Sequence, residues 1–174
     1  MVKFGIGQPL RRIEDERLLT GNGTYTDDIN INNQAYMFIL RSPFSNAIIR
    51  EIDYSNASKK KGVLGILGSK DIKNLNINHM RTTFLVKNRD GNEMPETTRH
   101  ILAEKFVRYA GDPVLAIIAD TLEIAEEAAE DIYIDYEEKK SITNLQKALN
   151  HDSPVVREEL SSNLCFDWEL GNQK

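Results

Sequence analysis

The chain has 174 residues, of which 40% are hydrophobic and 28% charged, and a formal net charge of −5. These values are typical of a globular domain that folds without disulfides or a structural metal, and the single cysteine excludes an internal disulfide framework. The negative charge argues against a general nucleic-acid binder, and the apolar runs are far shorter than the roughly 20 residues of a membrane span. No signal-peptide pattern opens the sequence, so the expected location is cytoplasmic.

The first part of the chain predicts an irregular arm followed by three strands. Residues 1–33 are rich in Gly, Arg, Asp and Asn with little periodicity, which indicates an extended arm with turns. Residues 36–41 and 47–52 are apolar runs typical of strands, and the turn-forming residues 42–46 between them predict a hairpin. A third apolar strand is expected over residues 63–67.

The strongest local pattern is a strand, a helix and a strand in succession. Residues 114–119 form a continuous apolar run, typical of a strand buried on both faces. Asp120 with Glu123 three residues later predicts a helix start of the capping-box kind, with glutamates filling the outer face of the helix. The apolar side chains at helical spacing are Leu122, Ala125, Ala129 and Ile132. Residues 132–136 then alternate as a strand does.

Shorter elements complete the prediction. Ser69 is expected to cap a helix that begins there, and residues 87–92 form the clearest surface loop. A further helix is expected over residues 143–149, capped by Ser141 or Thr143. The predicted fold class is therefore α+β, with several short strands and two or three helices.

Motifs for nucleotide binding fail on physical grounds. Gly5-Ile6-Gly7 opens like a dinucleotide fingerprint, but Leu10 replaces the third glycine and Pro9 stands where a helix should be starting. Residues 62–70 contain glycines and a lysine without the spacing of a P-loop. Neither segment is expected to bind a nucleotide.

Four residues are candidate transition-metal ligands of the nitrogen or sulfur type: His79, His100, His151 and Cys165. None lies within four residues of another, whereas structural zinc sites usually take ligands from close pairs, so a zinc site is not expected. Cys165 could be a nucleophile with a distant histidine, but a small buried hydrophobe between Leu164 and Phe166 is the preferred interpretation. The predicted site residues are thus none for catalysis, none for a cofactor and none for a metal.

The adjacent carboxylates are expected to be solvated. The pairs are Glu14-Asp15, Asp27-Asp28, Glu137-Glu138 and Glu158-Glu159. General acid–base catalysis needs carboxylates that converge from separate elements, with one pKa perturbed by burial. The arginine-rich segment 11–15 is better suited to docking on another surface. The residues alone therefore indicate a binding or structural module without visible chemistry.

Three segments resemble one family of proteins. Residues 12–29 carry the pattern R-x-E-D-x-R-L-L-T-G followed by Y-x-D-D-I, residues 41–49 resemble R-S-P-H-A-H-A-R-I, and residues 107–137 resemble V-R-Y-V-G-E-P-V followed by alanines and a Y-E ending. Together they are similar to the first domain of molybdenum hydroxylase large subunits, the family of xanthine dehydrogenase, aldehyde oxidase and carbon monoxide dehydrogenase. The first pattern resembles most the carbon monoxide dehydrogenase and archaeal glyceraldehyde dehydrogenase branch.

This resemblance covers nearly the whole chain and implies an α/β-hammerhead, with mixed strands and two main helices. It implies an extended N-terminal arm over 1–33, the hammerhead domain over 34–150, and a linker over 151–174 toward a missing molybdopterin-binding domain. Phe44 and Asn46 stand where the family pattern has histidines, which puts in doubt a role for those side chains at a subunit contact but leaves the fold unaffected.

Two glycine-containing turns have physical interpretations within such a domain. Gly21 and Gly23 are expected to form a turn that leads Tyr25 and Ile29 inward. Residues 111–113 are expected to form a tight turn that presents the buried strand, because glycine tolerates a positive φ and proline starts a strand well.

The function implied by the resemblance is that of an N-terminal structural domain, a fragment or split subunit, of a molybdenum-dependent oxidoreductase of the carbon monoxide or aldehyde/glyceraldehyde dehydrogenase type. The parent enzyme is implied to use molybdopterin cytosine dinucleotide, with iron–sulfur clusters and FAD on partner subunits. The implied partners are the molybdopterin-binding part of the large subunit and the flavin and iron–sulfur subunits. Without the missing cofactor domain the chain is expected to be inactive.

Two other functions stay open from the sequence. One is a free-standing adaptor module without enzymatic activity, and the other is a small-molecule binder that uses the glycine-rich arm. The substrate of a parent enzyme also stays open, because its specificity pocket is expected outside this sequence.

Overall fold

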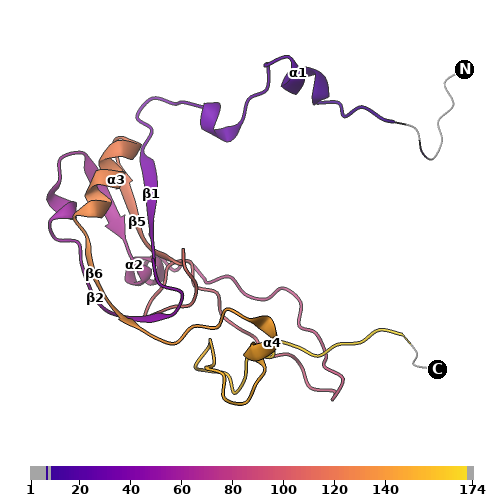
Figure 1. Ribbon diagram of the computed structural model, residues 1–174. Helices are drawn as coiled ribbons and strands as arrows, with labels where there is room; N and C mark the ends of the chain where they lie inside the picture. Colours follow the sequence, from indigo (N-terminus) through magenta and orange to yellow (C-terminus); the bar gives the residue numbers. More distant parts are fainter. Residues whose placement is uncertain (1–6, 8, 172–174) are drawn as a thin grey trace, which may run out of the picture. The chain divides into compact units, whose positions relative to one another are not determined.

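The computed structural model describes residue 7 and residues 9–171, which divide into two compact units, Met1–Gln34 and Ala35–Lys174. The elements are α1 (Asp15–Leu19), the 3-10 helix η1 (Thr26–Asp28), β1 (Tyr36–Arg41), β2 (Ala47–Asp53), the 3-10 helix η2 (Ala57–Lys59), β3 (Val63–Leu67), α2 (Ser69–Asn74), β4 (Phe106–Val107), β5 (Pro113–Ala119), α3 (Leu122–Glu130), β6 (Tyr133–Glu138) and α4 (Leu145–Ala148). The predicted α+β class is confirmed (Figure 1).

The first unit contains two short helices, α1 and η1, where the sequence predicted only turns. No described residue of this unit is buried. The side chains of Tyr25 and Ile29 are 67% and 56% exposed, so the prediction that the glycine turn leads them inward is wrong. The reason is that so few apolar residues, in helices of five and three residues, cannot build a core of their own.

The second unit contains two three-stranded antiparallel sheets, ordered β1-β5-β3 and β4-β2-β6. All the predicted strands exist, but the predicted hairpin between 36–41 and 47–52 is wrong, because β1 pairs with β5 while β2 pairs with β4 and β6. The five-residue connection 42–46 does not form the two-residue turn that would keep these strands together. It passes the chain from one sheet to the other.

Strand β5 is the centre of the core. Its burial is nearly continuous, as predicted, and α3 packs on β1 and β5 (Figure 1). Ile117 and Ala119 of β5 contact Ala125 and Ala128 of α3, which are fully buried. The small alanine side chains let the helix approach the sheet closely, so this layer excludes water with little side-chain volume.

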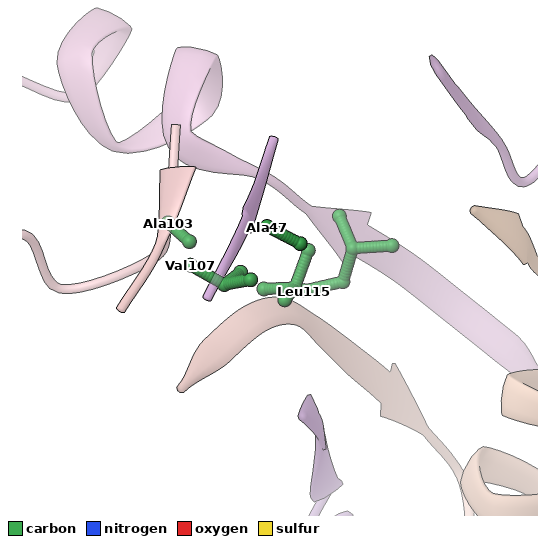
Figure 2. Close-up of a cluster of buried hydrophobic side chains, with 5 residues drawn as sticks. Ala47, Ala103, Val107 and Leu115 are labelled. Atoms are coloured by element: carbon green, nitrogen blue, oxygen red, sulfur yellow. The ribbon is translucent and has the colours of Figure 1, made fainter. Parts of the chain in front are cut away.

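A second cluster joins the two sheets. Figure 2 shows Ala47 of β2, Val107 of β4 and Leu115 of β5 grouped together with Ala103, and each of these is at most 4% exposed. The backbone N–H of Ala103 donates to the carbonyl of Pro113 over 2.7 Å. This cluster therefore holds the second sheet against the end of β5.

Helix starts fall close to the predicted positions, but the capping residues differ. Thr121, not Asp120, caps α3, because its Oγ1 accepts from the Ile124 N–H over 3.3 Å. The N-cap of α2 is Gly68, whose N–H donates to the Asp71 carboxylate, so Ser69 is the first residue of the helix.

Helix α4 is capped by Asn144, which accepts from the Lys147 N–H, and neither Ser141 nor Thr143 serves as predicted. Leu122 is 41% exposed rather than directed into the core, and Ile124 packs on the core instead. In each case neighbouring residues offered equivalent caps or apolar side chains, and the local sequence pattern does not distinguish between them.

Between α2 and β4 the chain makes a long, loosely paired excursion. Two isolated antiparallel bridges hold it, Met80 with Arg99 and Lys87 with Glu93, and the predicted surface loop 87–92 forms its tip. The tip contacts the C-terminal segment, where the Arg89 N–H donates to the Asp167 carbonyl over 2.9 Å.

Among the residues that the structure describes, no helix combines the length and apolar character needed to cross a membrane.

Replacing Leu115 with alanine is expected to lower the free energy of unfolding by about 3 kcal/mol, because the side chain is 1% exposed and its loss leaves a cavity between the sheets. Urea denaturation followed by circular dichroism measures this change. Leu64→Ala is the matched control on a strand: this leucine is 60% exposed, and its replacement should cost less than about 1 kcal/mol. Equal losses in the two variants would contradict the assignment of Leu115 to the core.

Candidate functional site

Two of the segments that resemble the molybdenum hydroxylases lie against each other. The Ser42 N–H donates to the Asp112 carbonyl over 2.9 Å, and the Gly111 N–H donates to the Ser42 carbonyl over 2.8 Å. The Arg41 guanidinium adds a bond from Nη1 to the Gly111 carbonyl over 2.9 Å. Ser42 is 3% exposed, so its two backbone bonds are formed where water cannot readily replace them, whereas the Arg41 bond is exposed. Segments 41–43 and 108–113 thus have a structural role at the junction of the two sheets.

The predicted tight turn at residues 111–113 is confirmed. The Asp112 N–H donates to the Tyr109 carbonyl over 3.1 Å, and the Asp112 carboxylate accepts from the Arg108 N–H over 2.9 Å. Gly111 has φ +91°, which a residue with a side chain adopts only at a cost.

The structure brings together two histidines that are 21 positions apart in the sequence. The rings of His79 and His100 lie 4.3 Å apart between centroids in an edge-on arrangement. The cause is the antiparallel bridge between Met80 and Arg99. In an antiparallel pair the chains run in opposite directions, so the residue before Met80 (His79) lies opposite the residue after Arg99 (His100). The Nδ1 atom of each ring is buried without a hydrogen-bond partner.

The surroundings of this histidine pair are positively charged. Burial lowers the pKa of His100, and the neighbouring His79 and Arg108 lower it further. The ammonium of Lys73 on α2 contacts the Glu104 carboxylate at 2.5 Å, and this hydrogen bond lowers the pKa of Glu104. Glu104 is therefore held as a carboxylate beside Lys73, and His100 is neutral near pH 7.

Three cations surround the ring of Phe106. Lys105, Arg108 and Lys139 lie 5.3, 5.6 and 5.4 Å from its centroid, within the range of a cation–π interaction. The Arg108 side chain is only 17% exposed, and its Nε is buried without a hydrogen-bond partner. Its Nη2 lies 3.8 Å from Glu158, which is longer than a hydrogen bond.

Two adjoining cavities open at this place. One of about 530 Å³ lies over the histidine pair, and one of about 350 Å³ lies beside it. Both are lined by Thr98, His100, Phe106 and Arg108. We call the larger one the histidine cavity; its lining also includes Lys73, His79 and Glu104.

The other sequence-derived candidates do not join this site. His151 and Cys165 are exposed, so the preferred interpretation of Cys165 as a buried hydrophobe is wrong. The segment around Cys165 forms neither helix nor strand, and Leu164 and Phe166 are themselves about half exposed. Within residues 7 and 9–171 no group of three His, Cys, Asp or Glu side chains could hold a metal ion.

The dinucleotide-like segment lies mostly outside the described residues, which include only its Gly7. The arginine-rich segment is exposed at Arg11 and Arg12. The carboxylate pairs are largely exposed as predicted, although Glu159 lies 3.3 Å from the Arg157 guanidinium. The site that sequence reasoning missed is the histidine pair, because rules of ligand spacing search for neighbours in sequence and not for partners across a bridge.

Comparison with known proteins identifies the family. Residues 20–140 match the family described as aldehyde oxidase and xanthine dehydrogenase, a/b hammerhead domain. The chain is 32% identical to the nicotine 6-hydroxylase large subunit of Paenarthrobacter nicotinovorans, over 91% of this chain and 19% of that protein. It is 28% identical to the carbon monoxide dehydrogenase large chain of Afipia carboxidovorans, over 98% of this chain and 21% of that protein.

A solved structure has the same fold. Quinoline 2-oxidoreductase from Pseudomonas putida 86 superposes with a TM-score of 0.78 and 31% identity, over 90% of this chain and 19% of that one. The chain therefore belongs to the aldehyde oxidase and xanthine dehydrogenase hammerhead-domain family. It spans about a fifth of the length of these relatives.

Replacing Gly111 with alanine is expected to lower the free energy of unfolding by about 1 kcal/mol, because the positive φ is unfavourable for a residue with a Cβ. No atom lies within 4 Å of the added Cβ, so the cost comes from the backbone alone. Gly65→Ala is the control, since its Cβ also meets no atom within 4 Å and its φ is not positive. Urea denaturation should show no loss for Gly65→Ala; an equal loss would contradict the role of the turn.

The lowered pKa of His100 predicts a loss of stability in mild acid. The unfolded chain takes up a proton near pH 6.5 while the folded chain resists it, so the free energy of unfolding falls as the pH drops from 7.5 through 6.5 toward the folded pKa. His100→Gln should reduce this fall between pH 7.5 and 5. Denaturant midpoints at several pH values measure this fall in the free energy of unfolding. The control is His151→Gln, which replaces an exposed histidine. An unchanged pH dependence in His100→Gln would refute the assignment.

Proposed function

We propose that this chain acts as the hammerhead domain of a molybdenum hydroxylase large subunit, of the carbon monoxide or aldehyde dehydrogenase type. The observation that carries the proposal is the family match over residues 20–140 together with the similarity of fold to an oxidoreductase structure. In this function the chain supports a cofactor-binding part and is inactive alone.

Exposed apolar side chains support a docking role. On the sheet β1-β5-β3, Met37 and Leu64 are 59% and 60% exposed. Residues alternate between the faces of a strand, so Met37 lies on the face opposite Phe38, which packs in the cluster with α3. Exposed apolar surface of this kind is typical of a contact with another part of an assembly.

The partners in this function are the molybdopterin-binding part of the large subunit and separate flavin and iron–sulfur subunits. The cofactor of the assembly is molybdopterin cytosine dinucleotide, with iron–sulfur clusters and FAD on the partner subunits. The name of one solved relative, a Cu,Mo-CO dehydrogenase, is consistent with molybdenum chemistry in such assemblies. No residue of this chain is assigned to the cofactor or to catalysis.

Co-purification tests the proposal. The chain is expressed with a polypeptide carrying the cofactor-binding part, and with the flavin and iron–sulfur subunits from the same source. The expected result is a stoichiometric complex that contains molybdenum and oxidises an aldehyde or carbon monoxide with a dye as acceptor. Failure to co-purify, with a stable monomer that unfolds cooperatively, would favour the free-standing adaptor without enzymatic activity.

A variant pair locates the contact. Met37→Glu with Leu64→Glu should reduce co-purification at least about tenfold, because burying two charges opposes docking. Leu122→Glu is the control, an exposed leucine on α3 that receives one negative charge where the double variant receives two. Equal recovery of both variants would exclude this sheet face as the docking surface.

A further inference from the structure

We propose that the histidine cavity binds a tetrahedral dianion of the phosphate and sulfate class. The cavity holds the edge-on pair His79 and His100, and it is joined through Arg108 to the neighbouring cavity. The proposal concerns residues of this chain alone, so it is independent of the proposed docking function.

The first argument is the sign of the charge. The residues lining the two cavities include five Lys or Arg and three Asp or Glu, an excess of two positive charges, while the whole chain has a net charge of −5. The carboxylates of Glu104 and Glu159 are already paired with Lys73 and Arg157. A divalent metal ion would be repelled here, whereas an anion is attracted.

The second argument is the direction of the hydrogen-bond donors. Nδ1 of each histidine is buried without an acceptor, and a buried N–H without a partner is costly, so Nε2 is the nitrogen that carries the proton whenever a ring is neutral. Neither ring makes a hydrogen bond within the described part of the chain that would occupy that N–H. Both histidines line the cavity, so two imidazole donors are available to a ligand there.

The third argument is the state of Arg108. Its guanidinium lies 3.8 and 3.9 Å from Glu158 and Glu159, too far for hydrogen bonds, so its donors are held in place by Phe106 without being saturated. A guanidinium pairs readily with a tetrahedral oxyanion through two parallel bonds. Lys73, on α2, also lines the cavity, where its ammonium is paired with the Glu104 carboxylate.

Binding and protonation are linked in this site. The groups facing His100 are His79, Arg108, Lys73 and Glu104. Burial lowers the pKa of His100, the neighbouring His79, Arg108 and Lys73 lower it further, and the Glu104 carboxylate acts in the opposite direction. A bound dianion counteracts the positive charges of Arg108 and Lys73, so it raises the pKa of His100. By linkage, the affinity for the anion increases as the pH is lowered. Sulfate is the best probe, because it keeps both negative charges between pH 7.5 and 5, the range in which His100 is tested.

Nuclear magnetic resonance of the histidine rings in the full chain tests the proposal without any variant. The chain has three histidines, and the exposed His151 is an internal reference. Before addition of the anion, His79 and His100 should show the Nε2–H tautomer. Titration with sodium sulfate, and separately with inorganic phosphate, should shift the signals of both rings and raise the pKa of His100 by about one unit. Equal shifts with sodium chloride at the same ionic strength would overturn the proposal.

Variants give the second test. His79→Gln with His100→Gln should weaken sulfate binding at least about tenfold at pH 6 in isothermal titration calorimetry. Controls that should change the affinity less than about twofold are His151→Gln and Lys61→Gln, which remove an exposed histidine and an exposed charge outside the cavity. Sulfate binding that is unchanged in the double variant, with circular dichroism showing it folded, would refute the site. If the double variant does not fold, the ring titrations of the unmodified chain decide.

Discussion

The arrangement of the second unit depends on the backbone hydrogen bonds between Ser42 and the turn at residues 111–112. These bonds fix the point at which the chain leaves one sheet and enters the other, because they tie the end of β1 to the start of β5 while the next five residues lead to β2. Each such bond contributes about 1 kcal/mol when water is excluded, and Ser42 is 3% exposed. The positive φ of Gly111 is the local condition that lets the turn reach Ser42.

The two sheets are held together from the same place. Leu115 and Val114 continue directly from the turn into β5, and they pack with Ala47 and Val107 of the second sheet. Beyond them, Ile117 and Ala119 pack under α3. One strand therefore serves both clusters, which explains why its sequence is apolar without alternation. Packing of this kind on both faces is a more demanding constraint than an amphipathic pattern, because no position can be polar without leaving a buried group unpaired.

The excursion between α2 and β4 differs from this core in its construction. Two isolated bridges and side-chain contacts hold it, and its tip is bonded to the C-terminal segment through Arg89 and Asp167. It nevertheless places His79 and His100 over Arg108, which follows β4 directly. The proposed anion site thus combines a loosely paired segment with an arginine that directly follows Val107 of the buried cluster. An anion bound there would link the excursion to Arg108 by charge-assisted hydrogen bonds.

The sequence by itself determined the strands, the main helix, the fold class and the family. Continuous or alternating apolar runs specify strands locally, and motifs such as residues 12–29 and 107–114 carry information that survives without coordinates. Which strands are neighbours was decided only by the tertiary structure, because residues 42–46 are compatible with a hairpin and with a crossing between sheets. The same holds for the exposure of Cys165, which depends on whether another segment covers it. The histidine pair also belongs to the tertiary structure, since one antiparallel bridge places side by side two residues that are 21 positions apart.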